Sequence, residues 1–398
     1  MKKILPLIVL AFYATSIFAQ FHQGKIKQKD YLQKIPYQKI QGVVIVPVTI
    51  NGNVYRFAFD TGATTFAISD KICKELNLEV IRQINAVDAS GETDKIRFVL
   101  LPEIDLQGIT FQNIPGVIFP EKSETTKFAE CFGVDGVVGS NMLRNSVVQF
   151  DEQNKQIIIA NDIKSVMPQQ NGCKKVKLSC KKSAPYFKIT LQKGAHKAVY
   201  SVLFDTGDSD GFFTLALNKL NSRVANIIAE SEGSFSMGVH GVYKKQKHIL
   251  LSVPNIEIGV TTFNNVIVTT TNSSHSRIGT KLLEYGKVTL DYKRKHFYFE
   301  PLDSINTNKP VENPLTFYST VQNEKIVVGH IWDKQLEAQL NLGDEVLSIN
   351  GIDIQSKNLC ELFRLEIPSN DNNIWELRDI HTGAIKTIEI KRMQLIKE

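Results

Sequence analysis

The stretches Phe57-Ala58-Phe59-Asp60-Thr61-Gly62 and Val202-Leu203-Phe204-Asp205-Thr206-Gly207 decide the fold of this chain of 398 residues. Each stretch is an apolar strand that ends in an Asp-Thr-Gly turn. Because this unit occurs twice, we predict that two aspartates face each other in one cleft. Two carboxylates within hydrogen-bond reach share one proton, so such a pair is suited to acid–base chemistry on water.

An internal repeat surrounds the two turns. A hairpin precedes each aspartate: the strand at Val43–Ile50 returns through Asn51-Gly52, and the strand at Tyr186–Leu191 returns through a turn at 193–196. After each turn we expect a short helical segment, a polar hairpin that contains glycine, and an apolar strand that ends in glycine. The repeat therefore predicts two lobes of the same architecture.

Strands dominate this pattern and helices are few, so the fold class is mainly β. We assign residues 36–164 to the first lobe, 165–182 to a linker and 183–301 to the second lobe. The linker is rich in Pro, Gln, Asn, Gly and Lys, which is typical of a connecting segment.

A different pattern follows the second lobe, at residues 313–395. It contains a strand at Lys325–Ile331 and the tripeptides Leu342-Gly343-Asp344 and Ile349-Asn350-Gly351. These tripeptides resemble the signature of the PDZ peptide-binding module. The resemblance implies a small PDZ-like domain that binds a peptide ligand by adding a strand to its sheet edge.

The first 19 residues have the order of a secretory signal: Lys2 and Lys3, an apolar run to Ile17, and Ala19 before the expected cleavage site. No later apolar run reaches the length that a membrane span requires. We therefore expect an exported protein, periplasmic or secreted, with no membrane span. Residues 21–35 are either a short pro-segment or a disordered tail.

Charge and cysteine content bear on the partners of the protein and on its disulfide bonds. The net charge of +6 is spread along the chain, with a local lysine cluster in the linker that we assign to a solvated face, so we expect no nucleic-acid partner. Export permits disulfides. Two pairings are open guesses, Cys173 with Cys180 and Cys73 with Cys131, which leaves Cys360 as an unpaired and buried thiol.

The two Asp-Thr-Gly turns, each with an apolar strand ending in glycine downstream, resemble the clan AA aspartic proteases. Two lobes in one chain is a pepsin-like feature, whereas Asp60-Thr61-Gly62-Ala63 is closer to the retropepsin form. The resemblance implies an aspartic-type endopeptidase that acts on peptide or protein substrates with no metal and no cofactor. It implies a catalytic pair, Asp60 and Asp205.

Supporting and substrate-binding roles also follow from this resemblance. The residues that support the active site would be Thr61, Gly62, Ala63, Thr206, Gly207, Gly139 and Gly279. The residues of the substrate-covering flaps would be Ser90, Gly91, Met237, Gly238 and Gly241. The glycines permit tight turns, and the two threonine hydroxyls are placed to bond across the junction between the lobes.

The second turn departs from the family pattern. Asp208 stands where the family usually has a small residue, and the strand before Gly279 lacks the acidic residue and the apolar pair that precede Gly139. A carboxylate at Asp208 would raise the apparent pKa values of the pair if it faces the cleft, and would matter little if it points to solvent. The alternative function is therefore a catalytically weak or inactive peptide-binding protein of the same fold.

Other classes of site fit the sequence less well. Gly207-Asp208-Ser209-Asp210-Gly211 matches a serine-hydrolase nucleophile elbow, but that fold needs a parallel sheet with interleaved helices. The same aspartates suggest a calcium loop, but Leu217 stands where such a loop needs glutamate. A glycosidase would not require Thr-Gly after both carboxylates, and both tryptophans, Trp332 and Trp375, lie outside the lobes.

Overall fold

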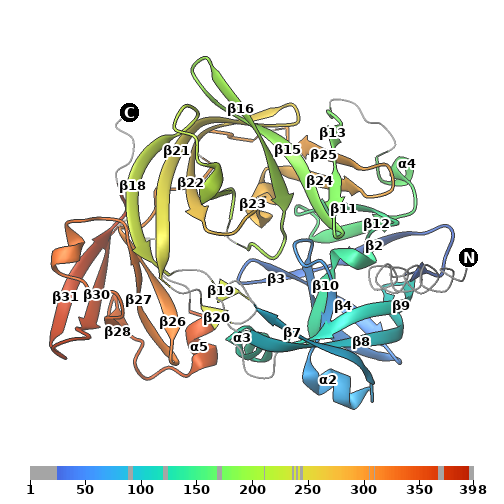
Figure 1. Cartoon of the computed structure of the whole chain (residues 1–398), viewed down its shortest axis with the longest axis horizontal. Coiled ribbons are helices and arrows are strands. Elements are labelled where there is room, and N and C mark those ends of the chain that lie inside the picture. Colours follow the sequence, from blue (N-terminus) through green and yellow to red (C-terminus); the bar gives the residue numbers. More distant parts are fainter. Residues whose placement is uncertain are drawn as a thin grey trace, which may run out of the picture.

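The structure, a computed structural model, is mainly β and contains four larger sheets (Figure 1). It describes residues 25–87, 93–119, 124–167, 173–209, 211–234, 237–238, 241–242, 245–303, 305–308, 310–365 and 372–393. We call the sheets the first, central, second and C-terminal sheets. Within these ranges, none of the helices has the length and apolar character needed to cross a membrane.

The first sheet carries the first Asp-Thr-Gly turn. Its strands are β1 (Lys25–Ile26), β3 (Gln38–Ile40), β4 (Val43–Ile50), β5 (Asn53–Asp60), β6 (Phe66–Ile68), β7 (Val80–Val87), β8 (Thr93–Leu106), β9 (Ile109–Ile118) and β10 (Gly136–Gly139). The expected hairpin joins β4 to β5 through Asn51 and Gly52, both of which have positive φ angles (50° and 81°). A two-residue turn with this geometry matches the twist of the flanking strands.

The second sheet carries the second turn. Its strands are β14 (Ser179–Lys181), β15 (Ala184–Lys193), β16 (His196–Phe204), β17 (Thr214–Ala216), β18 (Asn226–Gly233), β21 (Gln246–Ile258), β22 (Thr261–Thr271) and β23 (Ser276–Ile278). A small hairpin, β19 (Met237–Gly238) with β20 (Gly241–Val242), lies between β18 and β21 in the chain.

The two sheets share one pairing pattern. β10 runs parallel to β5 and antiparallel to β6, and β23 runs parallel to β16 and antiparallel to β17. The outer strands also correspond, because β6 is parallel to β9 as β17 is parallel to β22. The internal repeat in the sequence therefore corresponds to a repeat in strand pairing.

The central sheet combines strands from both repeats. Its strands are β2 (Leu32–Pro36), β11 (Val147–Asp151), β12 (Gln156–Ala160), β13 (Val176–Lys177), β24 (Gly286–Asp291) and β25 (His296–Pro301). β11 of the first repeat pairs antiparallel with β24 of the second. One continuous apolar core runs beneath the first, central and second sheets.

The C-terminal sheet has a separate apolar core around Trp375. Its strands are β26 (Phe317–Gln322), β27 (Lys325–Ile331), β28 (Glu345–Ile349), β29 (Ile352–Asp353), β30 (Asn372–Arg378) and β31 (Ile385–Lys391). β26 forms one edge of this sheet. Figure 1 places the sheet beside β18 and β21.

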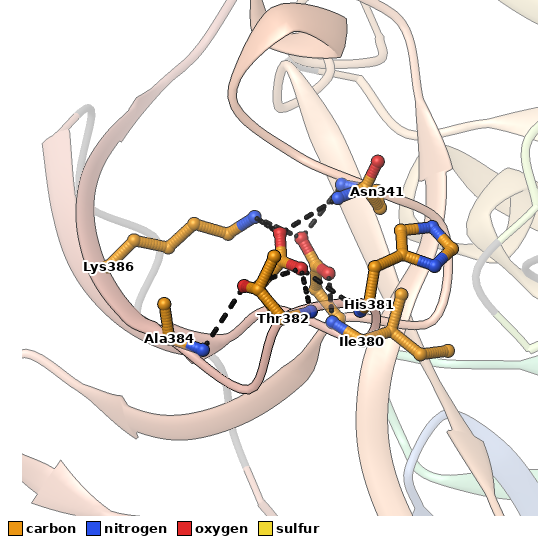
Figure 2. Close-up of polar contacts among 8 residues, drawn as sticks. Asn341, Ile380, His381, Thr382, Ala384 and Lys386 are labelled. Atoms are coloured by element: carbon orange, nitrogen blue, oxygen red, sulfur yellow. Dashed lines mark hydrogen bonds and ion pairs between the residues drawn. The ribbon is translucent and has the colours of Figure 1, made fainter.

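Asp344, the last residue of the Leu-Gly-Asp tripeptide, has a structural role. It is fully buried, accepts hydrogen bonds from the backbone N–H groups of Asn341 and Ile380, and pairs with Lys386 (Nζ–Oδ2 2.6 Å). Asn341 lies in the turn before β28, Ile380 follows β30 and Lys386 lies on β31, and Figure 2 shows these three residues brought together by polar contacts. The aspartate therefore joins the turn before β28 to the β30–β31 hairpin.

The helical elements are short. The α-helices are α2 (Asp70–Glu75), α3 (Glu124–Phe132), α4 (Ile163–Val166) and α5 (Leu359–Phe363). The 3₁₀ turns are η1 (Ser140–Met142), η2 (Leu217–Lys219), η3 (Thr280–Glu284) and η4 (Leu336–Ala338). The short helical segment expected after each Asp-Thr-Gly turn is α2 in the first repeat and the single turn η2 in the second.

The cysteine pairing differs from both expected pairings. Cys131 on α3 forms a disulfide with Cys360 on α5, 229 residues further along the chain. Cys73, Cys173 and Cys180 are free thiols, so the predicted Cys73–Cys131 and Cys173–Cys180 bonds and the unpaired Cys360 are wrong. The pairing depends on the docking of α3 against α5, a long-range contact that local sequence does not encode.

Strands occur on both sides of the expected first lobe, at residues 25–26, 32–36, 176–177 and 179–181. Residues 25–26 pair with β9 and residues 32–36 pair with β12, so the disordered-tail alternative is wrong from Lys25 onward. Within the expected linker, β13 joins the central sheet and β14 joins the second sheet. The signal segment at 1–19 lies outside the described residues.

Candidate active site

Two equivalent strand–turn units bring Asp60 and Asp205 together. Asp60 ends β5 and lies level with Gly139 of the parallel strand β10. Asp205 follows β16, whose last residue, Phe204, lies level with Ile278, immediately before Gly279. The parallel neighbour therefore supports each aspartate at the same position.

The apolar residues before the aspartates form the floor of the site. Phe59 and Phe204 each pack edge-on against Phe150 of the central sheet, with ring centroids 5.6 and 5.5 Å apart. All three rings are fully buried. One central-sheet residue therefore supports both turns from below.

Thr61 and Thr206 lock the two turns to each other. The Thr61 hydroxyl donates to Phe204 O (2.6 Å), and the Thr206 hydroxyl donates to Phe59 O (2.6 Å). Each hydroxyl also accepts the backbone N–H of the other threonine, at 3.0 and 3.1 Å. Both side chains are completely buried. These four bonds join the two repeats directly under the carboxyl groups.

Glycine is required in both turns because each carboxyl group lies against the opposite turn. A Cβ atom at Gly62 would lie 2.3 Å from Asp205 Oδ1, and one at Gly207 would lie 2.5 Å from Asp60 Oδ2. These distances are far below van der Waals contact. Any side chain at either position would displace a carboxyl group.

Gly139 and Gly279 support the turns from the neighbouring strands. A Cβ at Gly139 would lie 2.5 Å from Thr65 O, and one at Gly279 would lie 2.3 Å from Asp208 O. The residues after these glycines donate backbone N–H bonds to Ala63 O and Asp208 O (2.8 and 3.0 Å). Ala63 and Asp208 therefore occupy equivalent positions in the two repeats.

The two carboxyl groups have different surroundings. Asp60 Oδ1 accepts the backbone N–H of Gly62 (2.8 Å) and of Ala63 (3.0 Å). Asp205 Oδ1 accepts only the N–H of Gly207 (3.0 Å) among the bonds seen within its own turn, because the Asp208 N–H bonds to Asp205 O instead. The negative form of Asp60 is therefore better supported by its turn.

This asymmetry appears in the ionisation of the pair. Burial raises the pKa of Asp60, and the N–H groups of Ala63 and Gly62 and a side-chain bond with Asp205 oppose that rise. Burial also raises the pKa of Asp205, and the negative charges of Asp60 and Asp208 raise it further, well above the usual range. We expect Asp60 to carry the charge and Asp205 to carry the proton.

Asp208 forms an ion pair beside the dyad. Its Oδ2 lies 2.7 Å from Nε of Arg277, and both side chains are largely covered. Asp208 raises the pKa of Asp205, and Arg277 lowers it. Asp208 was identified from the sequence, whereas Arg277 was missed. The charged residue two positions before Gly279 was the signal that could have revealed it.

The expected flap residues lie partly outside the described residues and partly in a short hairpin of the second repeat. Ser90 and Gly91 lie outside the described residues, between the stems β7 and β8. The backbone of Met237, Gly238 and Gly241 forms the β19–β20 hairpin, which lies beside α3 and β26. The role of these residues as flaps stays a prediction.

The structure also bears on the alternative sites. β16 is followed by the strand β17 where a nucleophile elbow at Ser209 would require a helix. Ser209 O accepts a hydrogen bond from the Thr280 hydroxyl (2.6 Å), so this segment belongs to the support of the second turn. Across the described ranges, His, Cys, Asp and Glu form no group of three or more that could hold a metal ion.

Comparison with known families points to the same site. Residues 46–145 match the model of the gag-polyprotein putative aspartyl protease family. This segment is similar to a retropepsin-like aspartic protease domain. It spans about a quarter of the chain and includes Asp60, its turn and Gly139. No curated protein matches the chain.

Proposed function

We propose that the protein is an aspartic-type endopeptidase in which Asp60 and Asp205 activate one water molecule to hydrolyse a peptide bond. The reciprocal threonine bonds carry this proposal, because they hold two partly exposed carboxyl groups against each other's turn. The similarity of residues 46–145 to aspartyl proteases supports the class of reaction.

The proposed mechanism assigns one role to each aspartate. Asp60, as carboxylate, takes a proton from the water while the water oxygen attacks the carbonyl carbon of the substrate. Asp205, as carboxylic acid, donates its proton to the carbonyl oxygen. Asp60 then protonates the leaving nitrogen, the C–N bond breaks, and Asp205 recovers its proton from the diol. The step needs no covalent intermediate.

We propose a two-lobed, pepsin-like arrangement of retropepsin-like halves for the whole fold. The shared pairing pattern of the first and second sheets supports it. We also propose that residues 313–395 form a PDZ-like domain with a peptide ligand. The position of β26 at the end of the strand order and the buried Asp344 in the Leu-Gly-Asp turn support that assignment.

We propose that the protein is exported, to the periplasm or outside the cell. The order of basic and apolar residues in positions 1–19 supports cleavage of a secretory signal. The Cys131–Cys360 disulfide adds support, because such bonds persist in oxidising compartments.

Peptide-library cleavage read by mass spectrometry, from acid to neutral pH, tests the proposed activity. We expect Asp60→Asn and Asp205→Asn each to lower kcat by at least about 10³-fold, since each variant removes one of the two proton-transfer groups. Asp303→Asn, an exposed aspartate outside the site, is the matched control. Cleavage that persists in either dyad variant would refute the mechanism.

The alternative function is peptide binding without cleavage. The asymmetric second turn, with Asp208 in place of a small residue, is the observation that favours it. In that case the folded wild-type chain would retain peptides from the same library at every pH and release them uncut. Circular dichroism of each variant separates loss of chemistry from loss of fold.

A further inference from the structure

We propose that the Cys131–Cys360 disulfide is a redox-controlled clamp that ties the sheet of Asp60 to the sheet of Asp205 through the C-terminal sheet. The clamp has two ends. One is the covalent bond between α3 and α5, and the other is the contact between β27 and β18 (Figure 1). The predicted effect of the clamp on peptide cleavage rests on the proposed function, whereas the physical link between the sheets does not depend on that function.

The α3 end is joined to the strand that delivers Asp60. Phe132, next to Cys131, accepts a hydrogen bond at its carbonyl from Nη1 of Arg56 (2.8 Å). The backbone of Arg56 exchanges bonds with Asp135, whose Oδ2 accepts the Arg56 N–H (2.9 Å) and whose N–H donates to Arg56 O (2.7 Å). Arg56 lies on β5, so the first sheet moves with α3.

Side-chain contacts surround the disulfide at this end. Phe128 of α3 packs edge-on against Phe363 of α5, with ring centroids 5.4 Å apart. The Arg364 guanidinium lies 5.6 Å from the centre of the Phe132 ring and donates to Cys131 O. An ion pair between Lys127 of α3 and Glu324, in the turn between β26 and β27, adds to these contacts (Nζ–Oε1 3.4 Å), and the disulfide is the covalent link among them.

The other end holds β18 of the second sheet. The Ser234 N–H, directly after β18, donates to Gly329 O on β27 (2.7 Å). A Cβ at Gly233 would lie 2.5 Å from Gly329 O, so the two backbones are in close contact. Leu250 and Ile267 of the second sheet form an apolar cluster with Trp332, which follows β27.

This second contact is not closely packed along its whole length. A groove of about 560 Å³ separates β18 from the segment between β27 and β28. Charged and polar side chains line most of it, including Glu230 on β18, Lys247 on the adjacent strand β21, and Lys334 and Glu337 opposite. A junction of this kind permits relative motion once the covalent end is released.

A dithiol reductant opens the clamp by reducing the Cys131–Cys360 disulfide. Cys360 is half-buried, whereas Cys131 is 8% exposed, so the reductant thiolate attacks Sγ of Cys360. The S–S bond breaks and its electron pair leaves with Sγ of Cys131, which takes up a proton. The second thiol of the reductant then displaces Cys360, which leaves two protein thiols and a cyclic disulfide of the reductant.

Opening the clamp should weaken substrate binding more than it slows the hydrolysis step. A peptide that lies across both sheets needs them in a fixed relation, but Thr61 and Thr206 hold the dyad without the disulfide. We expect KM to rise about 5-fold or more, a typical coupling between sites, with kcat and its pH profile unchanged.

Hydrogen exchange with mass spectrometry tests the clamp independently of activity. We compare oxidised wild type, wild type reduced by dithiothreitol and alkylated under native conditions, and the double variant Cys131→Ser/Cys360→Ser. We expect the Ser234 amide and residues 126–135 to exchange at least about 10-fold faster in both opened forms. Cys73→Ser, which removes a buried free thiol of the first sheet, is the control and should match oxidised wild type.

Two results would overturn the proposal. One is unchanged exchange in both opened forms. The other is faster exchange in the opened forms with KM unchanged, which would mean that the disulfide stabilises the structure without controlling substrate binding. If the double variant fails to fold, the reduced and alkylated wild type still decides the question. If no form cleaves peptides, the proposed function fails and the exchange data still test the clamp.

Discussion

At the scale of single residues, the Asp208–Arg277 pair adjusts the pKa of Asp205, which burial and the charge of Asp60 raise first. Asp208 raises the pKa of Asp205 and Arg277 lowers it, so removal of one member leaves the other unopposed. Because the alkaline limb of activity reports loss of the Asp205 proton, Asp208→Asn should move that limb of the kcat/KM profile to lower pH. Arg277→Gln should move it in the opposite direction, to higher pH.

The double variant Asp208→Asn/Arg277→Gln supplies the internal control for this prediction. It removes both charges and should return the alkaline limb close to the wild-type position. If both single variants shift the limb in the same direction, the pair acts through structure and not through charge.

Sequence and structure agree best at the residues of the two turns. Asp60, Thr61 and Gly62 and their counterparts were predictable because the motif is local and occurs twice. The contact of Arg277 with Asp208 was not predictable, since it depends on the register of β23 beside β16, although a charged residue before Gly279 was a visible signal in the sequence. The Cys131–Cys360 bond depends on how two distant helices dock, which no local pattern records.

At the scale of elements, the threonine lock is the strongest link between the two strand–turn units. Thr61→Val keeps the shape of the side chain but leaves Phe204 O and the Thr206 N–H without partners in a fully buried site. We expect the free energy of unfolding to fall by about 3 kcal/mol. Urea unfolding followed by circular dichroism measures this change.

A conservative variant distinguishes the hydrogen bonds from packing at this position. Thr61→Ser keeps the hydroxyl and loses one methyl group, so it should retain most of the stability. Equal losses for Thr61→Ser and Thr61→Val would show that packing, and not the lock, stabilises the turns.

At the scale of the whole molecule, two buried histidines make the junction of the C-terminal sheet sensitive to acid. His248 and His330 pack ring to ring across this junction, with centroids 5.3 Å apart, and both are almost fully buried. Burial, and secondarily His248, lowers the pKa of His330 to about 3. Burial also lowers the pKa of His248.

The direction of the effect follows from proton binding. Between pH 6.5 and about 3 the unfolded chain protonates His330 while the folded chain does not, so stability falls as the pH falls. We expect His330 to account for a loss of about 3 kcal/mol between pH 7 and pH 4. Unfolding followed by the fluorescence of Trp332 and Trp375 measures it.

His330→Phe should remove most of this acid dependence while leaving stability at pH 7 similar. The reciprocal control, His381→Phe, changes an exposed histidine of the same sheet and should leave the acid dependence intact. If His330→Phe loses as much free energy of unfolding between pH 7 and pH 4 as the wild type does, the role of the buried pair is refuted.

The central sheet gives the two repeats an approximate twofold symmetry. β11 and β24 pair antiparallel in the middle of this sheet, each from the same place in its repeat. The register is centred on Gln149 opposite Thr289, so each repeat presents an equivalent strand to the other, as two identical copies in a symmetric dimer would. A single chain, unlike such a dimer, can carry different residues at equivalent positions. Ala63 in the first turn and Asp208 in the second are one such pair, and this difference allows Asp208 to pair with Arg277.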